Sequence, residues 1–204
     1  MNSREAVKKI IDILTRAISS NDRVRLIVSG GTSPQKILNL LDNTKFAWEK
    51  VEVMLADERL VKRDNEFSNE RNLKENFFCN YSKNASYKCI RDLQFDQDIR
   101  TEIALLGFGY DGHFASIFPD HLKNKEYVNL NHKPRILKTG ALGIPTVNRL
   151  TLNLAAFSQI ENIFIIVNSH KKMSVIEDAK FNKKLPLHYL INSSCLNIEL
   201  IKNF

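Results

Sequence analysis

The sequence predicts an α/β protein with a Rossmann-like, twisted and mainly parallel sheet that carries helices on both faces. Two observations support this: short apolar runs recur along the chain, and most are followed by a segment with helical spacing of apolar residues. Strands that alternate with helices pair in parallel through right-handed crossovers. The 204 residues contain no low-complexity linker or internal repeat, so a single domain over residues 1–204 is expected.

The first predicted helix covers Ser3–Ser19, with its apolar residues on one stripe and Ser3 as the N-cap. A strand over residues 25–29 follows and ends at Gly30-Gly31. Residues 32–34 (Thr-Ser-Pro) then supply the cap and first turn of a helix that reads KILNLL. This segment is therefore predicted to fold as strand, glycine turn and helix.

The same order recurs further along the chain. A strand over 51–56 runs into the triplet Asp57-Glu58-Arg59, and a helix is predicted over 68–78. The segment 79–100 is polar and weakly periodic, so it is predicted to be loop with at most a short helix. The remaining predicted elements are strands over 103–106, 149–154, 163–167 and 196–201, a short apolar helix at FASIF (114–118), and a helix at MSVIEDA (173–179).

Charge and composition restrict the class of partner. Thirty Lys and Arg against 23 Asp and Glu give a net charge of +7, which favours an anionic partner. No arginine-rich arm or aromatic-basic motif is present, so a small anionic substrate is preferred to nucleic acid. No apolar run approaches the roughly 18 residues of a membrane span, and no signal peptide is recognisable. We expect a cytosolic chain without a membrane partner, as a monomer or weak homodimer.

Metal and disulfide chemistry find little support in the sequence. The three cysteines have no CxxC spacing, and the histidines have no metal-ligand spacing such as HExxH. We therefore expect neither a disulfide framework nor a metal site.

Four unusual polar clusters each follow a predicted strand directly: GGTS, DER, GYDGH and SHKK. In an open α/β sheet, ligands bind in the crevice at the carboxyl ends of the strands. The sequence therefore predicts that these clusters meet at one site.

The GGTS cluster (30–33) combines close backbone approach, free N–H groups and a helix N-terminus, a combination that suits a phosphate. A tight turn that Thr32 or Ser33 merely caps is the alternative. The GK[ST] ending of a nucleotide P-loop is missing, which favours a monophosphate over a triphosphate.

Gly107, Gly109 and Gly112 match the spacing of the dinucleotide fingerprint GxGxxG. The match lies in mid-chain, Asp111 would place a carboxylate beside the pyrophosphate, and no acid ends a strand about 20 residues later. We therefore interpret the glycines as a turn that exposes Asp111 and His113. Histidine next to a carboxylate suits a general base, and a helix-capping histidine is the alternative.

The triplet 57–59 is either an ordinary solvated charge run or part of the site. At a strand end, Arg59 can hold an anion or stabilise developing charge on oxygen, and Asp57 can orient a histidine or a water. No GxSxG motif is present, so water is the expected nucleophile.

These clusters, in this order, resemble the 6-phosphogluconolactonase family, within the wider group that includes glucosamine-6-phosphate deaminases. The matching segments are SGGTSP (29–34), ADERLV with DNEFSN (56–69), LLGFGYDGHFASIFP (105–119), NRLTLNL (148–154) and IFIIVNSHKK (163–172).

The resemblance implies hydrolysis of 6-phosphoglucono-1,5-lactone to 6-phosphogluconate in the oxidative pentose phosphate pathway, without metal or organic cofactor. His113 would be the general base on water, and Arg59 or main-chain N–H groups would stabilise the oxyanion. Asp57 and Asp111 would position the imidazole or the sugar hydroxyls. The residues expected to hold the 6-phosphate are Gly30, Gly31, Thr32, Arg149 and Lys172.

Two alternatives remain at this level. A deaminase-like sugar-phosphate isomerase would carry a string resembling IAFNEP after DGH, whereas residues 115–119 (ASIFP) contain no acid. Deaminases also have Glu-Tyr where this chain has Glu58-Arg59. The second alternative is a sugar-phosphate sensor that binds without catalysis, although the retained His113 and its Asp neighbours favour proton transfer.

Overall fold

A six-stranded parallel sheet forms the centre of the molecule. The computed structural model describes residues 1–92 and 101–204. The strand order is β4-β2-β1-β5-β8-β9, and every neighbouring pair is parallel. The strands are β1 (Val24–Val28), β2 (Val51–Leu55), β4 (Ser86–Lys88), β5 (Thr101–Leu106), β8 (Asn162–Val167) and β9 (Ile198–Lys202).

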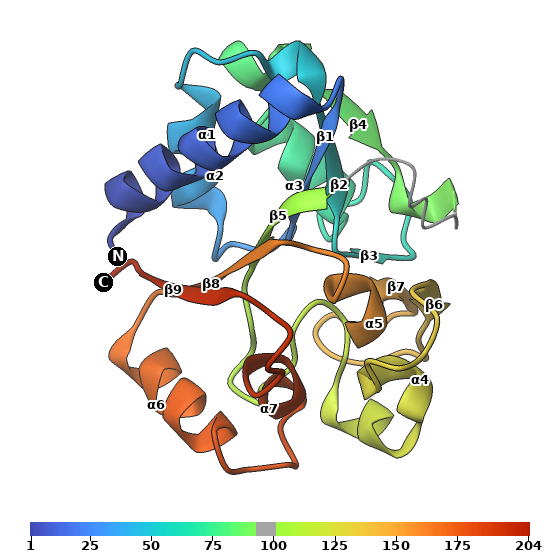
Figure 1. The fold of residues 1–204 in the computed structure, drawn as a ribbon. Coiled ribbons are helices and arrows are strands. Elements are labelled where there is room, and N and C mark those ends of the chain that lie inside the picture. The colour runs from blue at the N-terminus through green and yellow to red at the C-terminus, as the bar shows by residue number, and fades with distance from the viewer. Residues whose placement is uncertain (93–100) are drawn as a thin grey trace.

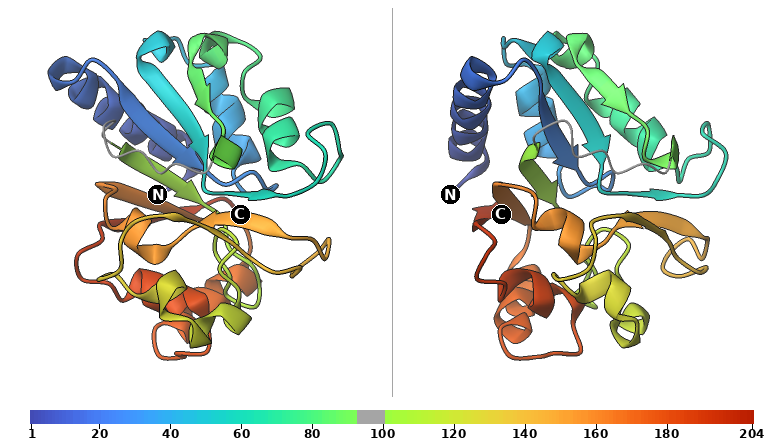
Figure 2. Two further views of the ribbon diagram at one scale, coloured as in Figure 1. Left: turned by 90° about the vertical axis from the view of Figure 1, so that its right-hand side faces the viewer. Right: turned by 45° about the vertical axis from the view of Figure 1, so that its right-hand side comes forward.

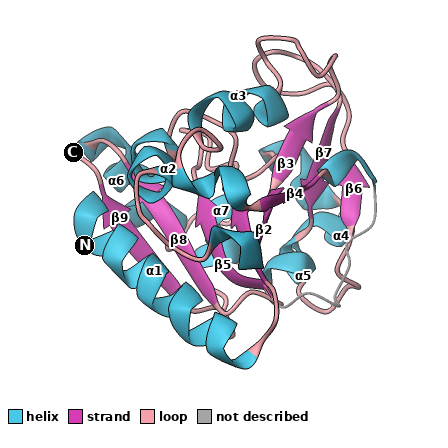
Figure 3. Ribbon diagram, turned by 90° about the horizontal axis from the view of Figure 1, so that it is seen from above, coloured by secondary structure: helices cyan, strands magenta, loops and turns pink. Residues whose placement is uncertain are grey.

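Helices cover both faces of this sheet, which confirms the predicted fold class. Helices α1 and α2 lie on one face, and α6 and α7 lie on the other (Figure 1). Seen from above, α1 runs alongside β9, in nearly the same direction as β9, β8 and β5 (Figure 3). The main helices are α1 (Ser3–Ser20), α2 (Gln35–Asp42), α3 (Asn69–Asn76), α6 (His170–Ala179) and α7 (Pro186–Ile191). Short 3-10 turns occupy Trp48–Lys50, Tyr81–Asn84, Ile90–Asp92 and Pro119–Lys123.

A second, three-stranded antiparallel sheet lies across the carboxyl end of the large sheet (Figure 2). It consists of β3 (Asp57–Arg59), β7 (Arg149–Leu152) and β6 (Ile136–Lys138), in the order β3-β7-β6. The short helix α4 (Lys125–Val128) precedes β6 in the chain, and α5 (Leu154–Phe157) follows β7. The strand predicted from residue 149 is therefore present, but it pairs antiparallel with β3 instead of joining the parallel sheet.

Continuous burial explains why the central strands are recognisable in the sequence. Every residue of β1, β2 and β5 is buried, so these strands have no face exposed to solvent. Trp48 is fully buried and meets the edge of the Phe77 ring at 5.5 Å between centroids. At the edge of the sheet, β9 is only half-buried, as its position predicts.

Several local predictions were wrong. FASIF (114–118) forms no helix: Ala115 has a left-handed φ of 46°, and Phe114 makes isolated antiparallel bridges with Phe108 and Ile117. Asn2, and not Ser3, is the N-cap of α1, and no side chain caps α2. Strand β4 lies within the segment predicted to be loop, of which residues 93–100 fall outside the described part.

No helix within residues 1–92 and 101–204 is both long and apolar enough to cross a membrane.

Candidate active site

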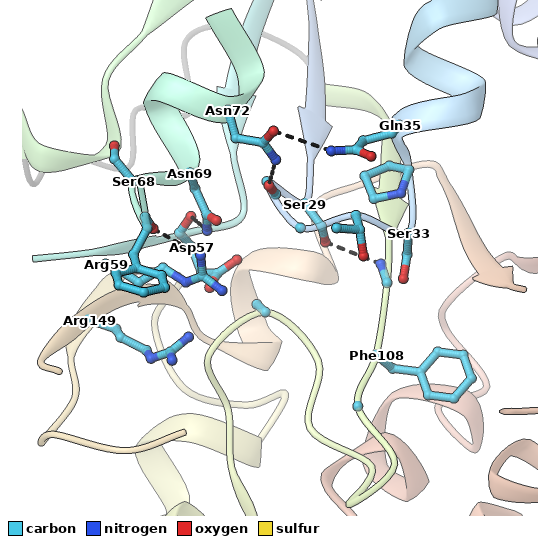
Figure 4. Close-up of a pocket in the computed structure, with 18 of the residues that line it drawn as sticks. Ser29, Ser33, Gln35, Asp57, Arg59, Ser68, Asn69, Asn72, Phe108 and Arg149 are labelled. Carbon is cyan, nitrogen blue, oxygen red and sulfur yellow. Dashed lines mark hydrogen bonds between the residues drawn. The ribbon is translucent and has the colours of Figure 1, made fainter. Parts of the chain in front are cut away.

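A cavity of about 450 Å³ opens at the carboxyl ends of the parallel strands, where the small sheet meets the large one (Figure 4). Its lining comes from the turn after β1, from β3, from the start of α3, and from the loop after β5. Segments far apart in the sequence thus converge at one edge of the sheet, as predicted. The predicted site residues that line the cavity are Gly30, Gly31, Thr32, Asp57, Arg59, His113 and Arg149.

Asp111 is not among the lining residues, but it holds the imidazole of His113. The His113 Nδ1 and Asp111 Oδ1 atoms are 2.6 Å apart, and the His113 backbone N–H donates to the same oxygen at 3.2 Å. Burial alone would raise the pKa of Asp111, but the hydrogen bond and charge of His113 outweigh it and lower this pKa. An ionised carboxylate only accepts hydrogen bonds, so Nδ1 carries the proton and the Nε2 lone pair is left to act as a base.

The fit around this pair is tight. A Cβ atom on Gly109 would lie 2.2 Å from Cε1 of His113 and 2.5 Å from Oδ1 of Asp111. On the other side, the Phe118 ring packs against the imidazole at 4.6 Å between centroids. Gly109 and Phe118 therefore restrict the orientation of the imidazole.

The glycine turn after β1 packs directly on α3. A Cβ on Gly30 would lie 2.3 Å from Cβ of Asn69, so only glycine allows this approach. The Gly30 carbonyl accepts a hydrogen bond from the Asn72 side chain. Gly31 has no atom within 4 Å of an added Cβ, and Thr32 is exposed. This part of the turn is therefore open to a ligand.

Two arginines form a cationic wall at one side of the cavity. Arg59 and Arg149 face each other across β3 and β7, and Figure 4 shows them opposite Ser29 and Ser33. Arg149 is 3% exposed; its guanidinium donates to the Leu142 and Pro145 carbonyls and lies over the Phe118 ring. Burial, followed by the charge of Arg59, lowers the pKa of Arg149. Two adjacent, partly desolvated guanidinium groups favour an anion between or beside them.

Lys172 reaches the edge of the site without lining the cavity. Its Nζ donates to Ser33 Oγ at 3.2 Å and to the Phe108 carbonyl. Burial lowers the pKa of Lys172, which is 8% exposed. Lys172 therefore lies at the end of the glycine turn and belongs to α6, whereas Arg59 and Arg149 belong to β3 and β7.

Asp57 is not the hydrogen-bond partner of His113. Its carboxylate is 5% exposed and accepts from Ser116 Oγ at 2.6 Å, while its backbone carbonyl accepts from the Asn69 side chain. The sequence left open which aspartate contacts His113, and the hydrogen bond is made by Asp111. Asp57 lies at the floor of the cavity, where it can meet a ligand.

Some residues of the site escaped the sequence analysis: Asn69, Asn72, Ser116 and Phe118. For the two asparagines a signal exists. Asn69 directly follows the capping Ser68, and Asn72 lies three residues further on. This spacing puts both asparagines on one face of α3, the first helix after the DER triplet. For Ser116 no such signal exists, because its direction depends on the left-handed turn at Ala115.

The fold and the site together define a class: an α/β protein with an open glycine turn and a histidine–carboxylate pair at the carboxyl edge of a parallel sheet. The family model described as "Glucosamine-6-phosphate isomerases/6-phosphogluconolactonase" matches residues 2–196. The chain belongs to this family.

Relatives of known name agree with this assignment. A 6-phosphogluconolactonase from Mesorhizobium japonicum is 33% identical over 187 residues, which cover 84% of this chain and 77% of the relative. One from Thermotoga maritima is 27% identical over 201 residues, covering 90% of this chain and 87% of the relative. The crystal structure of a 6-phosphogluconolactonase from Shewanella baltica has a TM-score of 0.85 at 24% identity, covers 99% of this chain and 93% of its own, and shows the same fold.

Proposed function

We propose that this protein hydrolyses 6-phosphoglucono-1,5-lactone to 6-phosphogluconate, the reaction named for its relatives. The observation that carries the proposal is the His113–Asp111 pair, whose imidazole lines the same cavity as the arginine wall and the open glycine turn. A sugar phosphate lactone has a reactive carbonyl at one end and a phosphate at the other. The base at His113 suits the carbonyl, and the cations near the glycine turn suit the phosphate.

The proposed reaction begins with a water molecule beside His113. The Nε2 atom removes a proton as the water oxygen bonds to the lactone carbonyl carbon, which gives a tetrahedral oxyanion. Arg59, or N–H groups of the glycine turns, stabilise this charge. The C–O bond to the ring oxygen then breaks, and the imidazolium returns its proton to that oxygen. The products are the open-chain acid and the regenerated base.

The phosphate is proposed to lie against Gly30, Gly31 and Thr32, with Arg149 and Lys172 as its cationic partners. The open space at Gly31 supports this placement, as does the hydrogen bond that joins Lys172 to the end of the same turn. Binding the unreactive end of the sugar holds the carbonyl near His113 and contributes to rate through orientation.

The direct test is incubation of the purified protein with freshly prepared 6-phosphogluconolactone. We expect acid release well above the spontaneous rate, and no ammonia from glucosamine 6-phosphate. Ammonia release would support a deaminase, and lactone binding without turnover would support a sensor; either result would overturn the proposal.

Replacement of Lys172 by methionine is expected to raise KM for the lactone about 10- to 100-fold, the usual value of a charged hydrogen bond to a phosphate. The effect on kcat should be smaller, because the phosphate does not react. Initial rates over a range of lactone concentrations separate the two constants.

Lys171→Met is the matched control. Lys171 is the neighbouring residue and carries the same charge, but it is exposed, whereas Lys172 is buried and bonds to Ser33 at the end of the glycine turn. We expect its KM to stay within about twofold of wild type. Equal effects of the two substitutions would show that Lys172 acts only through net charge.

A further inference from the structure

Glu58 lies between two predicted site residues, Asp57 and Arg59, that line the cavity, but does not line it itself. Its side chain is fully buried, and its two carboxylate oxygens accept four hydrogen bonds. Oε1 accepts from the backbone N–H groups of Arg59 at 2.6 Å and Asn69 at 2.8 Å. Oε2 accepts from the backbone N–H of Glu70 at 2.7 Å and from Ser68 Oγ at 3.1 Å. One carboxylate therefore joins strand β3 to the first turn of helix α3.

The side chain of Arg59 depends on this junction. Its Nη1 donates to the Phe67 carbonyl at 2.9 Å, and Phe67 directly precedes the residues that Glu58 binds. The Arg59 Nε atom is buried without a hydrogen-bond partner. Among the described residues, the hydrogen bond to the Phe67 carbonyl is therefore the contact that holds the guanidinium in place. If the start of α3 moves, the Phe67 carbonyl moves with it.

Arg91 closes the junction from the other side. Its guanidinium donates to the Arg59 and Val61 carbonyls at 2.9 and 2.8 Å, and its Nη2 lies 3.8 Å from Glu58 Oε2. Burial raises the pKa of Glu58, and the backbone N–H groups and the Arg91 charge act in the opposite direction. A carboxylate that accepts from four donors must be ionised to satisfy all of them.

From these contacts we infer that Glu58 is a positioning residue, whose carboxylate sets the place of the Arg59 guanidinium by fixing the start of α3 to β3. This inference rests on the proposed function, because Arg59 is assigned there to the developing charge. Glutamine cannot replace the carboxylate, since its NH₂ group faces an N–H or O–H donor where an acceptor is required.

A double-mutant cycle tests the inference. We expect Glu58→Gln to lower kcat/KM about 10- to 100-fold, the range that follows from a small displacement of a catalytic group. Arg59→Ala should lower it at least as far. The double variant should fall within about threefold of Arg59→Ala alone, because Glu58 then has no guanidinium left to position. Multiplied effects of the two changes would overturn the inference.

Glu70→Gln is the matched control. Glu70 is also a buried glutamate at the start of α3, but its carboxylate pairs with Lys74 and Arg63 and accepts from Cys89, and among the described residues it has no hydrogen bond to β3. We expect its kcat/KM to stay within about threefold of wild type. A loss equal to that of Glu58→Gln would show that any buried charge at this helix end has the same effect, and would overturn the inference.

Amide hydrogen exchange gives a readout that does not depend on activity. In Glu58→Gln the amides of Asn69 and Glu70 should exchange faster, while those of β1 and β5 stay protected. Should this variant fail to fold, Glu58→Asp keeps the charge and the Ser68 cap but shortens the side chain by one methylene group, and it is expected to show the same pattern with a smaller loss. Unchanged exchange at both amides would contradict the inference, whereas a wild-type protein without lactonase activity would overturn the proposed function and the inference together.

Discussion

Replacement of His113 by alanine is expected to lower kcat for lactone hydrolysis by about 10²–10⁴-fold, the usual contribution of a positioned proton-transfer group. Among the described residues that line the cavity, His113 is the one histidine, and its hydrogen bond to Asp111 leaves Nε2 free to take a proton from water. KM should change little, because the phosphate contacts lie elsewhere in the site.

Steady-state rates of both proteins, corrected for spontaneous hydrolysis, measure this effect, and thermal unfolding checks that the variant is folded. His132→Ala serves as the control, since His132 does not line the cavity and should retain wild-type kcat. A near-normal rate for the His113 variant would remove the imidazole from the mechanism.

The parallel sheet could be predicted because burial on both faces leaves a clear trace in the sequence. The strands β1, β2 and β5 are apolar at nearly every position, and each ends at a cluster of glycine or charged residues. Crossover handedness and the rule for the ligand crevice then follow from general principles. For this reason the sequence predicts that Gly31, Arg59 and His113 lie at one edge of the sheet.

The small antiparallel sheet left no comparable trace. Strand β3 has three residues, Asp57–Arg59, which is too short for any periodicity, and its partner β7 lies about ninety positions further along the chain. The pairing of Arg59 with Arg149 is therefore a product of tertiary structure. It makes one cationic wall from two residues to which the sequence analysis assigned separate tasks.

The loop after His113 shows how local pattern can mislead. Phe114, Ile117 and Phe118 have the spacing of a helix stripe, but they are buried by different neighbours in an irregular loop. The left-handed Ala115 ends any helix there and turns Ser116 toward Asp57. Tertiary packing outweighs helix propensity in so short a segment.

Replacement of Gly109 by alanine is expected to lower kcat by roughly 10²-fold or more, although no reacting group is removed. An added methyl group would lie 2.2 and 2.3 Å from the Cε1 and Nδ1 atoms of His113, well inside van der Waals contact. The imidazole must therefore rotate or shift and lose its hydrogen bond to Asp111, and a displacement of about 1 Å at a catalytic group is enough for a loss of this size.

Gly140→Ala is the matched control, because no atom lies within 4 Å of a Cβ added at Gly140. Steady-state kinetics should show wild-type kcat for this variant. In the double variant Gly109→Ala/His113→Ala, kcat should equal that of His113→Ala, since the methyl group then has no ring to displace. If Gly109→Ala retained wild-type kcat, the close pair of His113 and Asp111 would not be the arrangement that performs catalysis, and the base would have to be sought among the other residues of the cavity.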